Sequence, residues 1–216
     1  MIDWQKIDTV FLDMDGTLLD LHFDNFFWRE HVPARYAEVN SISVDEAKTT
    51  LYPIFQEVEG TMDWYCIDYW TERLDLDIAL LKVEVDHLIA VHPHVIPFLD
   101  ALREHNKKVV LVTNAHMKSL ELKMQRTQLA NHFDALVCSH DYRVPKEDTG
   151  FWELLHNTMP FSRSGTLLVD DSLPVLRAAH SYGIKNLLAI NKPDSKGPKR
   201  EISEFNAIAD FSAIMP

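Results

Sequence analysis

Five short runs of apolar residues recur along the chain, at positions 9–13, 109–114, 135–139, 166–171 and 187–190. Within each run the apolar residues are consecutive, rich in β-branched side chains, and do not alternate with polar ones. This pattern is typical of strands that are buried on both faces, as in a parallel sheet covered by helices. The first four runs end in polar residues, so polar side chains are expected to gather at one edge of the predicted sheet.

Apolar residues with helical spacing lie between these runs, at Val95, Leu99 and Leu102, at Leu120 and Met124, and at Phe151, Leu154 and Leu155. Ser172 is placed to cap a further helix, with Pro174 in its first turn and Gly183 at its end. Strands and helices therefore alternate over residues 1–20 and 92–216. We expect an α/β fold in this part of the chain, with a Rossmann-like, doubly wound parallel sheet.

Residues 21–91 contain no convincing strand, so we expect an all-helical domain inserted after the first strand. The segment 43–46 (Ser-Val-Asp-Glu) is a capping box with Ile42 as its hydrophobic staple. It begins a helical stripe that ends at Gly60, and Pro53 within that stripe predicts a kink or a break. Further helices are predicted over 64–74 and 78–88.

Composition and charge restrict the partners of the protein. The chain has 216 residues, of which 46% are hydrophobic and 25% charged, the usual balance of a globular protein with a full core. The formal net charge of −12 argues against a nucleic-acid polymer or an anionic membrane as partner. The N-terminal residues do not resemble a signal peptide, no apolar run is long enough to span a bilayer, and the two cysteines suit reduced thiols. We expect a cytoplasmic protein that is a monomer or a weak homodimer.

The segment Asp13-Met14-Asp15-Gly16-Thr17 is the most specific chemical feature of the sequence. Ligands of open parallel sheets bind beyond the carboxyl ends of the strands, and Asp13 is the polar residue that ends the first run. An aspartate at this place suits a nucleophile, and a second aspartate two residues later suits a general acid and base. The alternative is a helix cap or an Asx turn, which would need only one aspartate.

Two further segments place polar groups at the same edge, Thr113 with Asn114 and the pair Asp170 and Asp171, and Lys146 is a candidate to join them because these carboxylates need positive charge. Each has an ordinary structural explanation, as a cap or as a surface charge. Converging carboxylates are costly without a cation, and their oxygen ligands suit Mg²⁺. Thr113 and Asn114 are candidates for binding phosphoryl oxygens, and Lys146 for balancing the negative charge.

Taken in order, these motifs resemble those of the haloacid dehalogenase superfamily of Mg²⁺-dependent phosphohydrolases, whose helical cap the insert also resembles. The resemblance implies that Asp13 forms an aspartyl-phosphate and that Asp15 protonates the leaving oxygen and then activates water. It also implies that Mg²⁺ is held by Asp13, the backbone carbonyl of Asp15 and Asp171, with Asp170 nearby. In many relatives a proline follows the motif lysine, whereas here Pro145 precedes Lys146 and Glu147 follows it, which leaves the local loop shape open.

Segments in both the insert and the sheet domain are similar to the bacterial GMP/IMP nucleotidase branch: 12–21, 23–25, 64–70, 145–148 and 193–195. This resemblance implies a small phosphorylated metabolite as substrate, namely a purine mononucleotide. The candidate residues for reading the base are Trp64, Tyr65, Asp68 and Tyr69, although these aromatic side chains equally suit the core of the insert. A phosphatase for sugar phosphates or pyridoxal phosphate, a phosphomutase, and a phospho-acceptor module resembling a response-regulator receiver remain alternatives.

Overall fold

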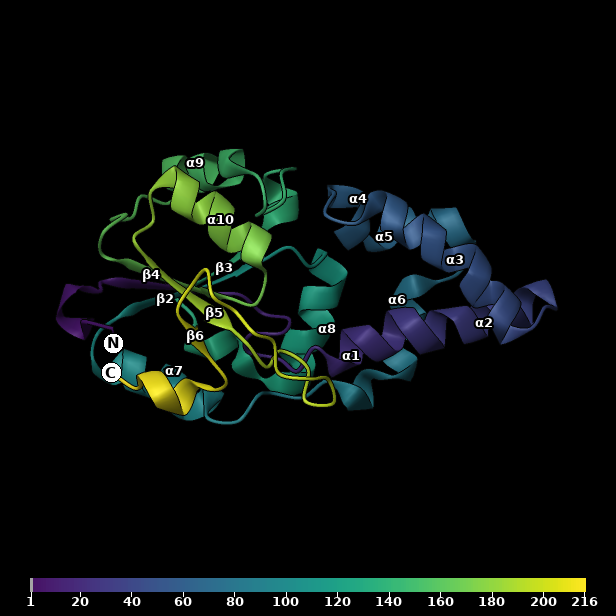
Figure 1. Ribbon diagram of the computed structural model, residues 1–216, viewed down its shortest axis with the longest axis horizontal. Helices are drawn as coiled ribbons and strands as arrows, with labels where there is room; N and C mark the ends of the chain where they lie inside the picture. Colours follow the sequence, from purple (N-terminus) through teal and green to yellow (C-terminus); the bar gives the residue numbers. More distant parts are fainter. Residues whose placement is uncertain (1) are drawn as a thin grey trace.

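The computed structural model describes residues 2–216 and is built around a six-stranded parallel sheet (Figure 1). The strands are β1 (Thr9–Leu12), β2 (Lys108–Thr113), β3 (Ala135–Cys138), β4 (Thr166–Asp170), β5 (Asn186–Ile190) and β6 (Ala207–Ile208). Their order across the sheet is β3-β2-β1-β4-β5-β6, so β1 lies between β2 and β4. The register pairs Leu12 with Leu111 on one side and with Val169 on the other. The predicted parallel α/β sheet is confirmed, and only the two-residue β6 left no pattern in the sequence.

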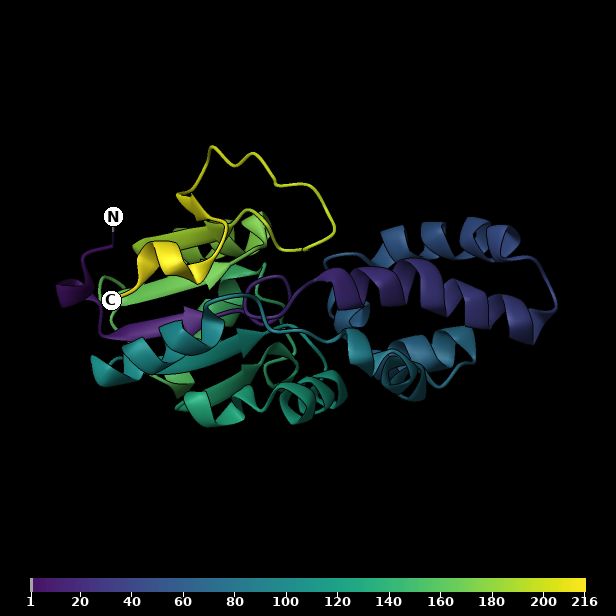
Figure 2. The same ribbon diagram turned by 90° about the horizontal axis from the view of Figure 1, so that it is seen from below.

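Helices cover both faces of the sheet (Figure 2). They are α7 (Val95–Glu104) and α8 (Met117–Thr127) on one face, and α9 (Thr149–Thr158) and α10 (Leu173–Tyr182) on the other. Successive strand residues point to opposite faces. Accordingly Val10 and Leu12 pack into the apolar cluster formed with α7 and α8, whereas Phe11 packs into the cluster formed with α9 and α10. Burial on both faces explains why the strands read as unbroken apolar runs.

The insert between β1 and β2 is helical, as predicted. It comprises α1 (His22–Phe26), a π-helical turn (Phe27–His31), α2 (Val32–Asn40), α3 (Val44–Val58), α4 (Met62–Tyr65), α5 (Ile67–Leu74) and α6 (Ile78–Glu84). It projects from one end of the sheet and has an apolar core of its own, which includes Phe27, Leu51 and Trp70 (Figure 2). We therefore propose that residues 21–91 form a cap domain and that residues 1–20 with 92–216 form the core domain, residue 1 lying outside the described part.

Short 3-10 segments complete the described chain, at Trp4–Lys6, Asp86–Leu88, Leu129–His132, Ser139–Asp141 and Phe211–Ile214. None of the helices within residues 2–216 combines the length and the apolar character needed to cross a lipid bilayer.

Some local sequence signals in the insert predicted its helices correctly, and others did not. The capping box forms, since the Ser43 hydroxyl accepts a hydrogen bond from the Glu46 N–H and the Glu46 carboxylate accepts one from the Ser43 N–H. The helix predicted over 64–74 is divided at Cys66, and the helical stretch 22–40 was not predicted. A break, one of the two outcomes predicted at Pro53, does not occur, because α3 runs through this residue. Pro53 and Thr49 both lie on the exposed side of α3, so the carbonyl that loses its helical partner can be hydrated.

Replacing Pro53 with alanine should stabilise the insert. The Pro53→Ala variant regains an N–H donor in the middle of α3, and we expect its free energy of unfolding to rise by about 1–3 kcal/mol. Urea unfolding followed by tryptophan fluorescence measures this, because Trp28, Trp64 and Trp70 all lie in the insert. Glu57→Ala, an exposed change on the same helix, is the control and should have little effect. Unchanged or lower stability in Pro53→Ala would contradict the prediction.

Candidate active site

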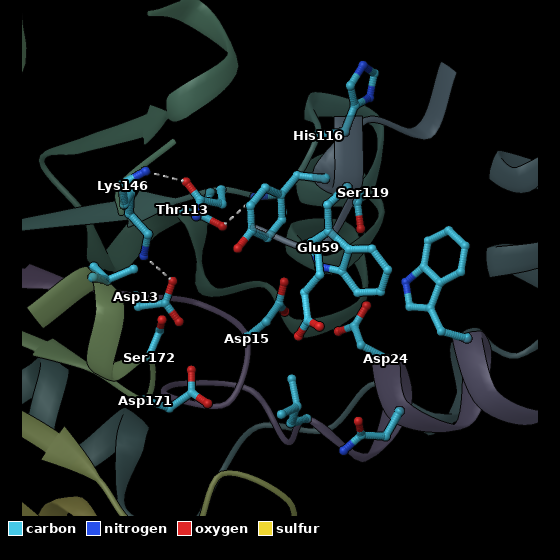
Figure 3. Close-up of a pocket in the computed structure, with 18 of the residues that line it drawn as sticks. Asp13, Asp15, Asp24, Glu59, Thr113, His116, Ser119, Lys146, Asp171 and Ser172 are labelled. Carbon is cyan, nitrogen blue, oxygen red and sulfur yellow. Dashed lines mark hydrogen bonds and ion pairs between the residues drawn. The ribbon is translucent and has the colours of Figure 1, made fainter. Parts of the chain in front are cut away.

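A buried lysine joins two carboxylates at the carboxyl edge of the sheet, and Figure 3 shows it pointing at one of them, Asp13. Lys146 donates from Nζ to Asp13 Oδ1 at 2.5 Å, to Asp170 Oδ2 at 2.8 Å and to the Val112 carbonyl at 2.9 Å. All three ionisable side chains are buried, and Lys146 is only 2% exposed. Asp13 follows β1 and Asp170 ends β4, so the neighbouring strands bring them together. The structure thus unites residues that lie far apart in the sequence.

Burial shifts the acid–base equilibria of this group. It raises the pKa of Asp13 to about 7 and that of Asp170 to about 6, although Lys146 acts in the opposite direction. Burial alone would lower the pKa of Lys146, but the Asp13 and Asp170 carboxylates outweigh it and raise that pKa. The lysine is therefore a fixed positive charge, while the carboxylates carry an excess of negative charge that one lysine does not balance.

Three aspartates are arranged as ligands for a cation. One carboxylate oxygen from each of Asp13, Asp170 and Asp171 lies within 4.8 Å of the others. Burial, followed by repulsion from Asp13, raises the pKa of Asp171 to about 7, and Arg200 at the rim contacts its carboxylate at 3.2 Å. A buried set of oxygen donors with unbalanced negative charge fits a hard divalent ion such as Mg²⁺. The geometry therefore supports a metal site at the place that the sequence predicted.

The glycine of the first motif has a steric role beside this site. Gly16 has a φ of +86°, a left-handed conformation that favours glycine. A Cβ atom at this position would lie 2.7 Å from Cγ of Asp171. A side chain here would therefore displace a candidate metal ligand.

The Asp15 carboxylate faces a second buried network and is not part of the aspartate cluster described above. Lys123 of α8 donates to Asp15 at 2.6 Å and to Asp24 of α1 at 2.7 Å. Lys82 of α6 donates to the other oxygen of Asp24 at 3.1 Å. Both lysines are buried, Lys123 being 1% exposed. This alternating chain of charges joins Asp15 of the core domain to two helices of the insert.

The charges of this network shift each other's pKa values. Burial raises the pKa of Asp15, with Lys123 opposing the change. Burial would also raise the pKa of Asp24, but Lys123 and Lys82 together lower it to about 2. Burial lowers the pKa of Lys82, whereas the two aspartates overcome burial at Lys123 and raise its pKa. Asp24 thus stays ionised and gives Lys123 a permanent partner.

Sequence reasoning missed this network, although a signal was present. Lys82 occupies the i+4 position of the apolar stripe that begins at Ile78, and Lys123 occupies the i+3 position after Leu120. A lysine inside an apolar helical stripe is unusual, because burial of its charge is costly unless it is paired. Such a lysine predicts a buried carboxylate opposite it.

The loops that carry Asn114 and Glu147 connect the core domain to the insert through hydrogen bonds. Asn114 Oδ1 accepts from the Lys146 N–H at 2.9 Å, and Asn114 Nδ2 donates to Glu147 at 2.8 Å. Tyr65 of α4 donates its hydroxyl to the same Glu147 carboxylate at 2.5 Å. Thr113 is buried, and its hydroxyl accepts from the Ala115 N–H at 3.0 Å. The unusual Glu147 therefore leaves Lys146 in place and adds a contact to the insert.

A cavity of about 690 Å³ lies between the insert and the core domain, and its size suits a small metabolite. Its floor includes Asp13, Asp15, Thr113, Lys146 and Asp171 (Figure 3). Its opposite wall comes from the insert and includes Trp28, Phe55, Glu59, Trp64 and Tyr65. Of the four candidate residues for base recognition, Trp64 and Tyr65 line the cavity, whereas Asp68 and Tyr69 are not among its lining residues.

Comparisons with known proteins agree with this architecture. The model of the haloacid dehalogenase-like hydrolase family matches residues 7–183, and the chain belongs to this family. It is a phosphatase of that family and a homologue of a nucleotidase. The family assignment sets aside the receiver alternative.

The similarity to curated relatives extends over the whole chain. The sequence is 38% identical over 215 residues to the GMP/IMP nucleotidase YrfG of Escherichia coli, covering 100% of this chain and 97% of that protein. The pyrimidine 5′-nucleotidase YjjG of the same organism is 24% identical over 189 residues. The matched part covers 77% of this chain and 78% of that protein.

Solved structures show the same fold. A HAD phosphatase from Thermococcus onnurineus has a TM-score of 0.77 at 22% identity, with 93% of each chain covered. CbbY from Rhodobacter sphaeroides, solved in complex with phosphate, has a TM-score of 0.67 at 14% identity, with 95% of each chain covered. Both therefore support the core and the inserted helical domain as one known architecture.

Mg²⁺ should stabilise the protein more at neutral than at acidic pH. The folded-state pKa values of Asp13 and Asp171 are raised from 3.8 to about 7, so their contribution to metal-free stability is full below about pH 4. It is lost as the pH rises to about 7, where ionised carboxylates repel each other. A bound cation reverses this loss. We expect the Mg²⁺-induced rise in Tm to be larger at about pH 7.5 than at about pH 5.5.

Thermal unfolding with Mg²⁺ or with a chelator, at both pH values, measures this difference. The Asp171→Asn variant is the control and should show a smaller Mg²⁺ effect at neutral pH. A Tm shift of the same size at both pH values in the unmodified protein would count against a metal site made of these carboxylates.

Proposed function

We propose that this protein is a Mg²⁺-dependent phosphomonoesterase that hydrolyses the purine 5′-mononucleotides GMP and IMP to nucleoside and phosphate. The observation that carries the proposal is the position of Asp13, which is paired with buried Lys146 on the floor of a cavity closed by an aromatic-lined insert. Full-length similarity to a GMP/IMP nucleotidase supports the choice of substrate.

Asp13 is the proposed nucleophile. Its carboxylate attacks phosphorus, the bond to the ester oxygen of the nucleotide breaks, and an aspartyl-phosphate forms. Lys146 holds the Asp13 carboxylate in place and balances negative charge during the attack. Thr113 and the backbone after Asp13 are the proposed partners of the phosphoryl oxygens, and Asn114 orients the Lys146 loop.

Asp13, Asp171 and the backbone carbonyl of Asp15 are the proposed Mg²⁺ ligands, with Asp170 as a direct or water-mediated one. When bound, the ion would neutralise the carboxylates and the phosphoryl group. Gly16 leaves the space that the Asp171 carboxylate needs.

Asp15 is the proposed general acid and base. It gives its proton to the leaving oxygen and then takes a proton from the water that hydrolyses the aspartyl-phosphate. Burial favours the protonated form that the first step needs. Lys123 remains paired with Asp24 when Asp15 is neutral, so neither protonation state of Asp15 leaves the lysine without a partner.

The insert offers a place for the base. Trp28 and Trp64 stack with their ring centroids 5.9 Å apart, and both line the cavity. Glu59 lies on the same wall. Guanine and hypoxanthine share an N1–H donor that a carboxylate can accept, whereas adenine presents an unprotonated nitrogen there. We therefore propose Glu59 as the group that distinguishes GMP and IMP from AMP, with Trp64 and Tyr65 beside it.

Lys123 should act as a positioning residue for Asp15. The Lys123→Met variant removes the positive charge beside Asp15, which raises the pKa of that carboxyl further. A smaller fraction of Asp15 is then ionised at neutral pH and able to act as the base. We expect kcat to fall roughly 10- to 100-fold, with the pH–rate profile displaced to higher pH. Steady-state hydrolysis of GMP across the pH range measures both effects.

Lys118→Met is the matched control, because Lys118 lies on the same helix but is exposed and does not contact Asp15. Lys123→Arg keeps the positive charge and should retain most of the pH profile. It provides the second test if Lys123→Met folds poorly. A wild-type kcat and pH profile in folded Lys123→Met would remove Lys123 from the mechanism.

A substrate panel with and without Mg²⁺ tests the proposed function. We expect kcat/KM for GMP and IMP to exceed that for AMP by at least about tenfold, because AMP loses one charged hydrogen bond. Pyrimidine nucleotides, sugar phosphates and pyridoxal phosphate should rank lower still. Asp13→Asn should abolish hydrolysis of every substrate, since no nucleophile remains.

The outcomes separate the parts of the proposal. Retained turnover in Asp13→Asn with Mg²⁺ present would refute the nucleophile. Sugar phosphates or pyridoxal phosphate ranking first would refute the purine substrate and leave the phosphatase chemistry standing. Transfer of the phosphoryl group to a second position of a sugar phosphate would favour a mutase.

A further inference from the structure

A second cluster of metal-ligating side chains lies apart from the acidic site. Cys66, His116 and His140 each offer one ligand atom, and these three atoms lie within 4.8 Å of one another. Cys66 precedes α5 in the insert, His116 precedes α8, and His140 lies in the 3-10 segment after β3. His116 stands across the cavity from Asp13 and Asp171 in Figure 3. The cluster therefore joins the insert to two separate elements of the core domain.

The donor types select a different metal from the one expected at the acidic site. One thiolate and two imidazoles suit Zn²⁺, whereas Mg²⁺ prefers oxygen ligands. In tetrahedral zinc sites, bond lengths of about 2.0–2.3 Å place the ligand atoms about 3.3–3.8 Å apart. The upper limit of 4.8 Å on the present separations exceeds this range by about 1 Å, a difference that side-chain rotation can close.

The two histidines are in a suitable state to bind a metal. His140 Nε2 is buried and has no hydrogen-bond partner among residues 2–216. Burial lowers the pKa of both His116 and His140 and so favours the neutral imidazole, the form that binds a metal. A buried ring nitrogen without a partner costs free energy, and a metal ion would satisfy it.

Asp68 is placed to support His116. Its Oδ2 atom lies 3.7 Å from His116 Nε2, and its Oδ1 atom accepts from Lys118 at 2.5 Å. A metal on His116 Nδ1 would replace the long 3.3 Å hydrogen bond from the Lys118 N–H and leave Nε2–H to donate to Asp68. A carboxylate behind a metal-bound histidine is a common second layer of zinc sites. A thiolate at Cys66 would offset half of the charge of Zn²⁺, and the Asp68 carboxylate would be shared between His116 and Lys118.

We propose that Cys66, His116 and His140 form a zinc site that joins the insert to the core domain. On binding, the Cys66 thiol releases its proton to solvent and its sulfur bonds to the metal, with no change in oxidation state. Because the ligands come from both domains, an occupied site holds the cavity closed. Zinc bound here therefore slows the exchange of substrate and product.

Cobalt spectroscopy on the full chain tests the site without relying on activity. The chelator-treated protein is titrated with Co²⁺ in excess Mg²⁺, which occupies the acidic site. We expect one equivalent of Co²⁺ to give the thiolate-to-cobalt charge-transfer band and the intense d–d bands of a tetrahedral ion, and Zn²⁺ to displace it. Cys66→Ser should lose the charge-transfer band, and both Cys66→Ser and His140→Ala should bind Co²⁺ at least about tenfold more weakly.

Cys138→Ser is the matched control. Cys138 is the other cysteine, it lies two residues before His140, and its Sγ donates to the Ala115 carbonyl at 3.1 Å instead of joining the cluster. It should keep the band. A cobalt spectrum without a thiolate band, or a band that survives Cys66→Ser and disappears in Cys138→Ser, would overturn the site.

The proposed effect on closure has its own test. With Mg²⁺ saturating, about one equivalent of Zn²⁺ should inhibit phosphate release by the unmodified protein, a chelator should reverse this, and Cys66→Ser should resist it. Equal inhibition of both proteins would mean that zinc acts at the acidic site, and would overturn the closure role. The cobalt spectra stand whether or not the proposed nucleotide substrate is correct, so failure of one proposal is distinguishable from failure of the other.

Discussion

The ion pairs of Lys146 with Asp13 and Asp170 are the interaction on which the site depends. Three aspartates meet at one sheet edge in surroundings that disfavour ionised groups, and a single buried lysine offsets part of their charge. When all three carboxylates are ionised, two negative charges remain within this set, and exposed Arg200 contacts only Asp171, at the rim. The residual charge equals that of one divalent cation, so the same imbalance that raises the carboxylate pKa values creates an affinity for a metal.

Sheet topology made much of this predictable. Consecutive apolar residues identified strands buried on both faces, and parallel strands place their carboxyl ends at one edge, so Asp13, Thr113 and Asp170 could be expected to meet. Lys146 could be placed there only through the order of the motifs, because nothing in its own surroundings distinguishes it from a surface lysine. The helical stretch 22–40 was missed because its consecutive aromatic residues give no clear helical stripe.

The network of Asp15, Asp24, Lys82 and Lys123 could not be predicted by the same reasoning. Its members come from the loop after β1 and from three helices, and they belong to two domains. Lys123 is shared between Asp15 of the core domain and Asp24 of the insert, so the proposed acid and base is coupled electrostatically to the position of the insert. Moving α1 away would remove one of the two partners of Lys123 and strengthen its hold on Asp15. Closure of the insert and the proton affinity of Asp15 are thus two aspects of one set of charges.

Several contacts between the insert and the core domain are polar, which bears on how the cavity opens. Tyr65 contacts Glu147, Asp68 contacts Lys118 and Asp86 contacts Arg126, while Ile89 packs against the apolar core of the insert and against one of those of the sheet. Opening the cavity would exchange these exposed pairs for hydration at modest cost, whereas moving Asp24 away from buried Lys123 would break a buried pair and cost more. A balance of this kind would let substrate charge, or the proposed zinc ion at the domain boundary, shift the insert between open and closed positions.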